Sequence, residues 1–286
     1  FTAVISHPFS NEMYPNSPPL DDRSKEMRRL VIDGLDGGGR GHLGSSMSLI
    51  EIMRVIYDDV ANHRPDDPMW EERDRCILSK GHGCLALYAA LACHNYFPRE
   101  EMRQFCHLPS RLGGHPERSK VPGVEASTGA LGHGLSIGVG MALAARIRKR
   151  KNRVFVAMGD GEINEGSVWE AAMSASKHQL SHLTAIVDYN KIQSYGRTSE
   201  VLDLEPLLDK WRAFGFETVE CDGHDVEALL AVLGEPLSST KPSMVIAHTV
   251  KGKGVAFAEN DPEWHHKSRV PADQIDAMYA ALAENS

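Results

Sequence analysis

Cysteine pairs and long apolar runs are both missing from this sequence of 286 residues. Its five cysteines are an odd number, and no two are spaced as C-x-x-C, which argues against a disulfide framework and a zinc cluster. Reduced thiols predict a cytoplasmic protein. No apolar run approaches the roughly 20 residues of a membrane helix, and no basic segment followed by an apolar stretch marks a leader near residue 1. We therefore expect no membrane partner.

A basic surface is also missing, because the formal net charge is −8. The one dense run of Lys and Arg, from Arg146 to Arg153, follows an apolar stretch with helical spacing. Such a run is more typical of a solvated helix end than of a nucleic-acid patch. We expect no nucleic-acid partner.

Short apolar strands alternate with helices over the second half of the chain. Residues 1–20 are rich in Pro, Ser and Asn and predict an extended N-terminal arm. Apolar spacing predicts helices at 22–37, 48–57, 84–92, 135–150, 165–178, 204–214, 225–233 and 272–283, and strands at 154–158, 183–187, 217–220 and 244–247. This order predicts an α/β fold with a mostly parallel sheet flanked by helices on both faces.

Two consecutive strands of this pattern end in polar loops. The first ends at Gly159-Asp160-Gly161-Glu162, and the second is followed by Asn190, 30 residues after Asp160. A G-D-G alone is more often a simple turn, but parallel strands bring their carboxyl ends to one edge, where ligands bind. Carboxylate and amide oxygens suit a hard cation such as Mg²⁺, and the next helix start suits a phosphate.

These two loops resemble those of thiamine-diphosphate enzymes, in which a GDG precedes an Asn by about thirty residues. The resemblance implies that Mg²⁺, or Ca²⁺ or Mn²⁺ in its place, is bound by Asp160, Asn190 and the carbonyl of Ile192. It also implies that thiamine diphosphate is contacted by residues Gly159, Asp160, Gly161, Glu162 and Asn190.

Four further motifs resemble transketolase. They are G-H-L-G around His42, S-K-G-H-G around His82, G-G-H-P-E around His115, and K-G-K-G at Lys251 followed by W-H at His265. The resemblance places the four histidines in the active-site cleft as catalytic residues, and His82, His265 and Lys251 near the diphosphate. Imidazoles titrate near neutral pH and exchange hydrogen bonds with sugar hydroxyls, which suits cleavage of a ketose.

A further loop, T-G-A-L-G-H-G at residues 128–134, resembles the transketolase loop that lies beside the cofactor. The resemblance implies cofactor contacts for Gly129, Ala130 and Leu131. Two positions depart from the family pattern: His133 stands where Gln is usual, and His266 stands where Gly is frequent. An altered substrate preference is open.

Two glutamates, Glu165 and Glu170, match family acids at the interface between subunits. Glutamates near a helix start also suit the helix dipole without any interface role. Both interpretations stay open.

The resemblance extends from about residue 22 to 283, so it assigns residues 21–286 to the diphosphate-binding domain of a transketolase. The pyrimidine-binding domain, which carries the glutamate that activates the cofactor, has no counterpart here. We expect a C-terminal transketolase subunit to supply it, in an α2β2 heterotetramer that transfers a two-carbon ketol unit from a ketose to an aldose acceptor. The donor and acceptor sugars are not predicted.

Other functions remain to be weighed. The chain could be the diphosphate-binding alpha subunit of a 2-oxo acid dehydrogenase, but that enzyme needs no row of sugar-binding histidines. A deoxyxylulose-phosphate-synthase type or phosphoketolase-like activity is a second alternative. A non-catalytic scaffold is a third, although such a protein would be expected to lose Asp160, Asn190 or several of the histidines.

Overall fold

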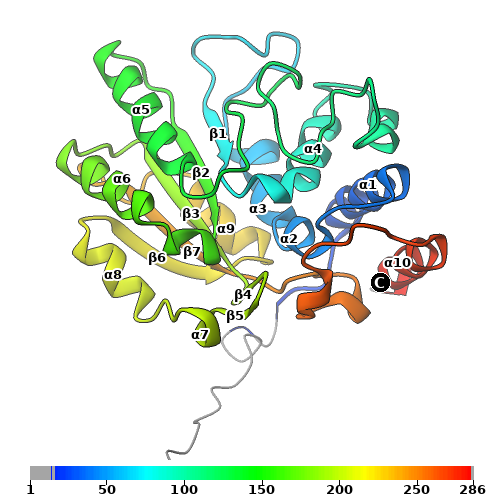
Figure 1. The fold of residues 1–286 in the computed structure, drawn as a ribbon. Helices are drawn as coiled ribbons and strands as arrows, with labels where there is room; N and C mark the ends of the chain where they lie inside the picture. Colours follow the sequence, from blue (N-terminus) through cyan, green and yellow to red (C-terminus); the bar gives the residue numbers. More distant parts are fainter. Residues whose placement is uncertain (1–13, 15–16, 285–286) are drawn as a thin grey trace, which may run out of the picture.

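The computed structural model describes Tyr14 and residues 17–284. A five-stranded, wholly parallel sheet forms the centre, with the order β1-β2-β3-β7-β6. Its strands are β1 (Arg75–Leu78), β2 (Val154–Gly159), β3 (Leu183–Tyr189), β6 (Glu217–Asp222) and β7 (Ser243–His248). Helices pack on both faces (Figure 1), so the predicted fold class is confirmed.

Two apolar clusters lie on opposite sides of the sheet because side chains alternate along each strand. In β2, Val154, Val156 and Met158 face one cluster, whereas Phe155 and Ala157 face the other. The first cluster is covered by α5 (Gly134–Ile147), α6 (Gly166–Lys177) and α8 (Leu207–Ala213). The second is covered by α1 (Asp22–Gly38), α2 (Leu43–Met47), α3 (Ile50–Val55), α4 (Cys84–Cys93), α9 (Val226–Leu233) and α10 (Ala272–Glu284).

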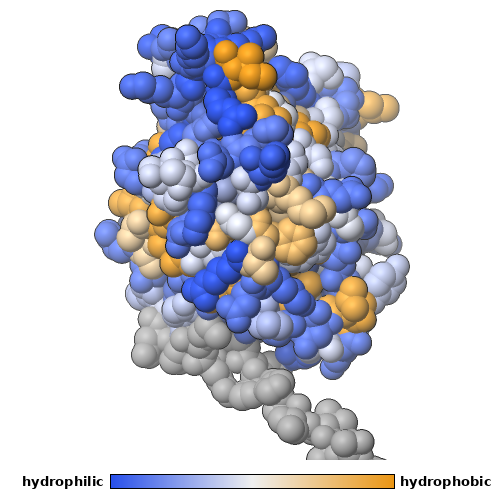
Figure 2. Space-filling view, turned by 90° about the vertical axis from the view of Figure 1, so that its left-hand side faces the viewer, coloured by the Kyte–Doolittle hydropathy of each residue, from blue (hydrophilic) through white to orange (hydrophobic). Residues whose placement is uncertain are grey.

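The face formed by α5, α6 and α8 is mostly hydrophilic, with apolar side chains between the polar ones (Figure 2). Two of its large apolar side chains are well exposed, Ile147 in α5 and Met173 in α6. None of the described helices is both long enough and apolar enough to span a bilayer.

Several predicted elements differ from the structure in detail. The helix predicted at 48–57 is α3 followed by a π-helical turn, Ile56–Val60, and α2 precedes it unpredicted. The helix predicted from 204 begins at Leu207, because the ring of Pro206 keeps Glu205 out of the helical region. Strand β1 was not predicted, since four residues with three apolar side chains give too short a pattern.

Short elements follow the carboxyl end of β3. A hairpin of β4 (Ile192–Gln193) and β5 (Gly196–Arg197) leads into the short helix α7 (Thr198–Val201). Of the predicted N-terminal arm, Tyr14 and residues 17–20 are described and form neither helix nor strand. The rest of the arm lies outside the described residues. Ser17 donates a hydrogen bond to Asp222 at the end of β6, 2.5 Å away.

Candidate functional site

A cavity of about 270 Å³ opens at the carboxyl edge of β2 and β3. Segments from most of the chain meet there, including the loops after β1, β2, β3 and β7. The lining residues are His42, Ser45, Lys80, His82, His115, Gly129, Leu131, Gly159, Asp160, Gly161, Glu162, Asn190, Ile192, Gln193, Ser194, Lys251 and His265. All four predicted histidines and all three predicted metal-binding residues are among them.

The loops after β2 and β3 are joined directly. The two strands are parallel neighbours, with Gly159 opposite Asp188. Asp160 accepts the N–H of Gly161 at 2.7 Å and the N–H of Lys191 at 2.5 Å, so its carboxylate bridges both loops. Asn190 lies in the second loop, where its Oδ1 accepts the N–H of Ile192 at 3.2 Å. The adjacency predicted from the strand order is therefore present.

A positive charge already lies among the predicted metal-binding groups. The buried Lys251 ammonium donates to the carbonyl of Ile192 at 2.6 Å. Burial lowers the pKa of Lys251 to about 8, and the carboxylate of Asp160 opposes this shift. Burial likewise raises the pKa of Asp160 to about 6, opposed by Lys251. The ammonium stands in for a cation, so these oxygens fit a divalent metal ion.

The wall beside Gly161 fits an anion. A Cβ added to Gly161 would lie 2.9 Å from Cβ of Gln193, so only glycine allows this approach. The amide nitrogen Nε2 of Gln193 is buried and has no hydrogen-bond partner among the described residues. An unpaired buried donor is costly, and a diphosphate oxygen would satisfy it. No described group of three His, Cys, Asp or Glu side chains could hold a metal ion, which agrees with a site that combines one carboxylate with amide and carbonyl oxygens.

The four histidines come from four separate loops and form one row. The ring of His42 lies 5.2 Å from that of His82, 5.7 Å from that of His265 and 6.4 Å from that of His115, between centroids. Burial and neighbouring positive groups lower the pKa values of His42 and His265 to about 3. Burial lowers the pKa of His82 even more strongly, and that of His115 too. Neutral imidazoles both donate and accept hydrogen bonds.

A fifth histidine lies beside this row. Residues 39–42 pair with 266–270 through two hydrogen bonds of 2.9 Å between Gly41 and Lys267. This bridge places His266 opposite His42, with ring centroids 4.6 Å apart. The family departure at residue 266 therefore adds an imidazole at the mouth of the cavity.

A buried polar network under the cavity was not predicted. Asp188 forms an ion pair with Lys80, accepts the hydroxyl of Ser48 at 2.5 Å and accepts the hydroxyl of Thr249. Asn190 also donates to Asp188 at 3.4 Å. Lys80 and Asp188 stand within or beside the motifs that predicted the site, but nothing in the sequence indicated that they pair across 108 positions.

Some predicted site residues lie away from the cavity. Gly129 and Leu131 line it, whereas Ala130 is exposed and does not. His133 is exposed, and its Nδ1 lies 2.9 Å from the carbonyl of Leu131. Glu165 and Glu170 are exposed near the start of α6 and in its second turn. Their interface role stays a prediction.

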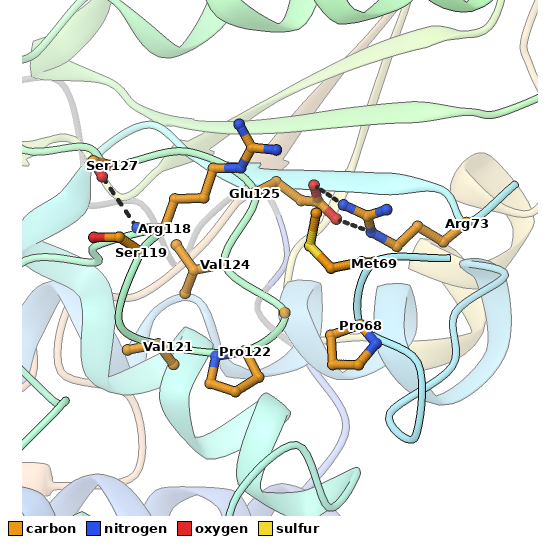
Figure 3. A pocket seen from close by; sticks show the side chains of 11 residues that line it. Pro68, Met69, Arg73, Arg118, Ser119, Val121, Pro122, Val124, Glu125 and Ser127 are labelled. Carbon is orange, nitrogen blue, oxygen red and sulfur yellow. Dashed lines mark hydrogen bonds and ion pairs between the residues drawn. The ribbon is translucent and has the colours of Figure 1, made fainter. Parts of the chain in front are cut away.

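A second cavity, of about 420 Å³, lies between residues 68–73 and 118–127 (Figure 3). Arg73 and Glu125 form a two-pronged ion pair on its wall, with distances of 2.7 and 2.9 Å. Arg118 extends above Val124 and is anchored at its backbone N–H by Ser127. None of the predicted site residues lines this cavity.

The family model described as "transketolase, thiamine diphosphate binding domain" matches residues 21–285. The chain belongs to the transketolase family. One of the two subunits of an apulose-4-phosphate transketolase from Actinobacillus succinogenes is 43% identical over 267 residues, which cover 93% of this chain and 96% of the relative. A 6-deoxy-6-sulfo-D-fructose transketolase subunit from a Clostridium species is 41% identical over 248 residues, covering 86% and 90%.

Longer transketolases match over the same region only. Human transketolase is 34% identical over 249 residues, which cover 87% of this chain and 40% of the human protein. A crystal structure of a transketolase variant from Pichia stipitis superposes with a TM-score of 0.82 at 30% identity, covering 92% of this chain and 44% of that one. The chain thus spans less than half of these transketolases. The predicted enzyme class and the resemblance to the N-terminal subunit of a two-chain transketolase are confirmed.

Proposed function

We propose that residues 21–286 form a diphosphate-binding domain that holds thiamine diphosphate through a divalent cation, within a two-chain transketolase. One observation carries this proposal. The Asp160 and Asn190 loops are joined at the sheet edge, with an ammonium among their oxygens and neutral histidines on the facing wall. Asp160, Asn190 and the Ile192 carbonyl would hold Mg²⁺, while Gln193, Gly161 and Lys251 would face the diphosphate.

The histidines act on the sugar in this proposal. When bound, the cofactor supplies the carbanion chemistry that breaks and forms carbon–carbon bonds beside a carbonyl. The imidazole nitrogens of His42, His82, His115 and His265 donate to and accept from the ketose hydroxyls. A neutral ring takes the hydroxyl proton as the C2–C3 bond breaks and returns it to the product. Burial of the rings excludes water from this proton transfer.

A second chain completes the enzyme in this proposal. Two relatives that this chain covers for nine-tenths or more of their length are named as transketolase subunits. We propose a C-terminal transketolase subunit with the pyrimidine-binding domain and the activating glutamate, an α2β2 assembly and a cytoplasmic location. The relatives are named for a ketose phosphate and a sulfo-ketose. A ketose with an anionic group is therefore our proposed donor, and His266 beside the exposed Arg40 supports it at the cavity mouth.

Calorimetric titration with thiamine diphosphate and Mg²⁺ tests the cofactor site. We expect Asp160→Asn to weaken cofactor affinity about 100-fold, because a metal-ligand oxygen loses its charge. The exposed Asp66 supplies the control variant Asp66→Asn, which should bind like wild type. Absence of binding by the wild-type chain, with and without its partner, would favour a scaffold. Turnover of pyruvate in place of ketose plus aldose would favour the dehydrogenase alternative.

A further inference from the structure

One carboxylate at the cavity is already fully occupied by protein donors. Glu162 follows the G-D-G turn and was expected to contact the cofactor. It is only 2% exposed. Its Oε1 accepts the hydroxyl of Ser79 and the N–H of Gly132 at 2.9 Å, and its Oε2 accepts the N–H of Gly159 at 3.0 Å. Both oxygens are therefore directed at the protein.

The three donors belong to three different segments. Ser79 lies directly after β1, Gly132 lies in the loop before α5, and Gly159 ends β2. Ser79 extends the network, since its Oγ accepts the N–H of Gly134 at 3.1 Å. A charged acceptor strengthens each of these hydrogen bonds relative to a neutral one.

Each segment carries part of the cavity wall. The segment after β1 presents His82, the loop before α5 presents Leu131, and the turn after β2 presents Asp160. The segments also touch closely: a Cβ added to Gly134 would lie 2.2 Å from Oγ of Ser79, and one added to Gly81 would lie 2.8 Å from the backbone nitrogen of Gly129. A small shift of one segment therefore moves the others.

We propose that Glu162 is a positioning residue that fixes these three wall segments relative to one another and does not itself contact the cofactor. What the walls hold rests on the function proposed above, whereas the fixing of the walls does not. Glu162 acts through Gly159 on the neighbouring Asp160 and through Ser79 and Gly132 on the histidine and leucine walls.

Two substitutions separate this role from general destabilisation. Glu162→Gln keeps the shape but has one oxygen, which can serve Ser79 and Gly132 while the amide N–H₂ meets the N–H of Gly159. Two donors then face each other, so the turn after β2 loses its bond. Ser79→Ala removes one donor and leaves the N–H of Gly134 unpaired, while the bond from Gly159 to Glu162 remains.

Hydrogen exchange measured by mass spectrometry on the purified chain tests the positioning. In Glu162→Gln we expect about 10-fold to 100-fold faster exchange at Gly159 and its neighbours. In Ser79→Ala we expect the increase at residues 132–134 and not at Gly159. The exposed Glu227 on α9 gives the control Glu227→Gln, which should leave exchange in these segments unchanged. Faster exchange spread evenly over the sheet, or none in the three segments, overturns the proposal.

Calorimetry on the same proteins links the walls to the cofactor. We expect Glu162→Gln to weaken binding of thiamine diphosphate with Mg²⁺ about 10-fold, at a thermal midpoint of the cofactor-free chain that Ser79→Ala matches. Unchanged affinity together with faster exchange at Gly159 would overturn the link from Glu162 to the cofactor wall. A wild-type chain that binds no cofactor would instead refute the proposed function, and the exchange measurement would still decide the role of Glu162.

Discussion

Three buried histidines of the cavity give up their charge when the chain folds. The pKa values of His42 and His265 fall to about 3, and that of His82 falls well below its ordinary value, in each case mainly through burial. An unfolded histidine titrates near 6.5. At neutral pH the folded chain therefore presents rings that hold one proton each and can pass it on.

The same shift makes folding sensitive to acid. Below about pH 6.5 the unfolded chain binds a proton at His42 that the folded chain refuses, so stability falls as the pH drops from there toward 3. His42→Asn should remove about 2 kcal/mol of the loss between pH 6.5 and 5. Urea unfolding at several pH values measures this. The exposed His178 provides the control His178→Asn, and equal acid slopes in both variants would contradict the expectation.

Helix α5 shows how glycine sets the distance between an element and the sheet. Gly138 faces β2, and an added Cβ would lie 2.5 Å from Cγ2 of Val156. Gly140 lies on the same helix but is exposed, with no atom within 4 Å of its added Cβ. The two positions differ in packing and share their helical backbone.

Opposite effects are expected from the same substitution at these two glycines. Gly138→Ala should lower the free energy of unfolding by about 1–3 kcal/mol, because the new methyl group overpacks the helix against Val156. Gly140→Ala should raise it by about 0.5–1 kcal/mol, because alanine favours a helix more than glycine does. Urea unfolding of both variants is the measurement. A gain of stability at residue 138 would show that α5 can move away from the sheet.

Elements with a strong apolar period were predictable, and those defined by distant partners were not. Helix α4, wholly buried, and strands β2 and β3 matched their predicted ranges closely. Strand β1 has only four residues and exists because it pairs with β2, far along the chain. Likewise the motifs identified Asp160, Asn190 and the histidine row, whereas the ion pair of Lys80 with Asp188 depends on a fold that brings two loops together.

At the scale of the whole molecule, the proposed cofactor cavity opens at an edge of the chain that carries exposed apolar side chains. Gln193 and Ser194 line the cavity. The next residue, Tyr195, is 89% exposed, and Leu202 at the end of α7 is 57% exposed. Large apolar side chains beside an unfinished site are typical of a surface that a partner covers. This agrees with a cofactor shared between unlike chains.

Association with a C-terminal transketolase chain should therefore depend on Tyr195. We expect the chain alone to show no ketol transfer, and co-expression to yield an α2β2 complex that acts on a ketose and an aldose. Tyr195→Ser should weaken assembly about 10-fold or more, because a buried tyrosine is a frequent hot spot. The control Leu108→Ser alters a side chain that is 98% exposed in another loop, and should assemble normally. Light scattering after size exclusion, paired with the turnover assay, measures both. Equal weakening by the two variants, or an active lone chain, would contradict a partner docked at the cavity edge.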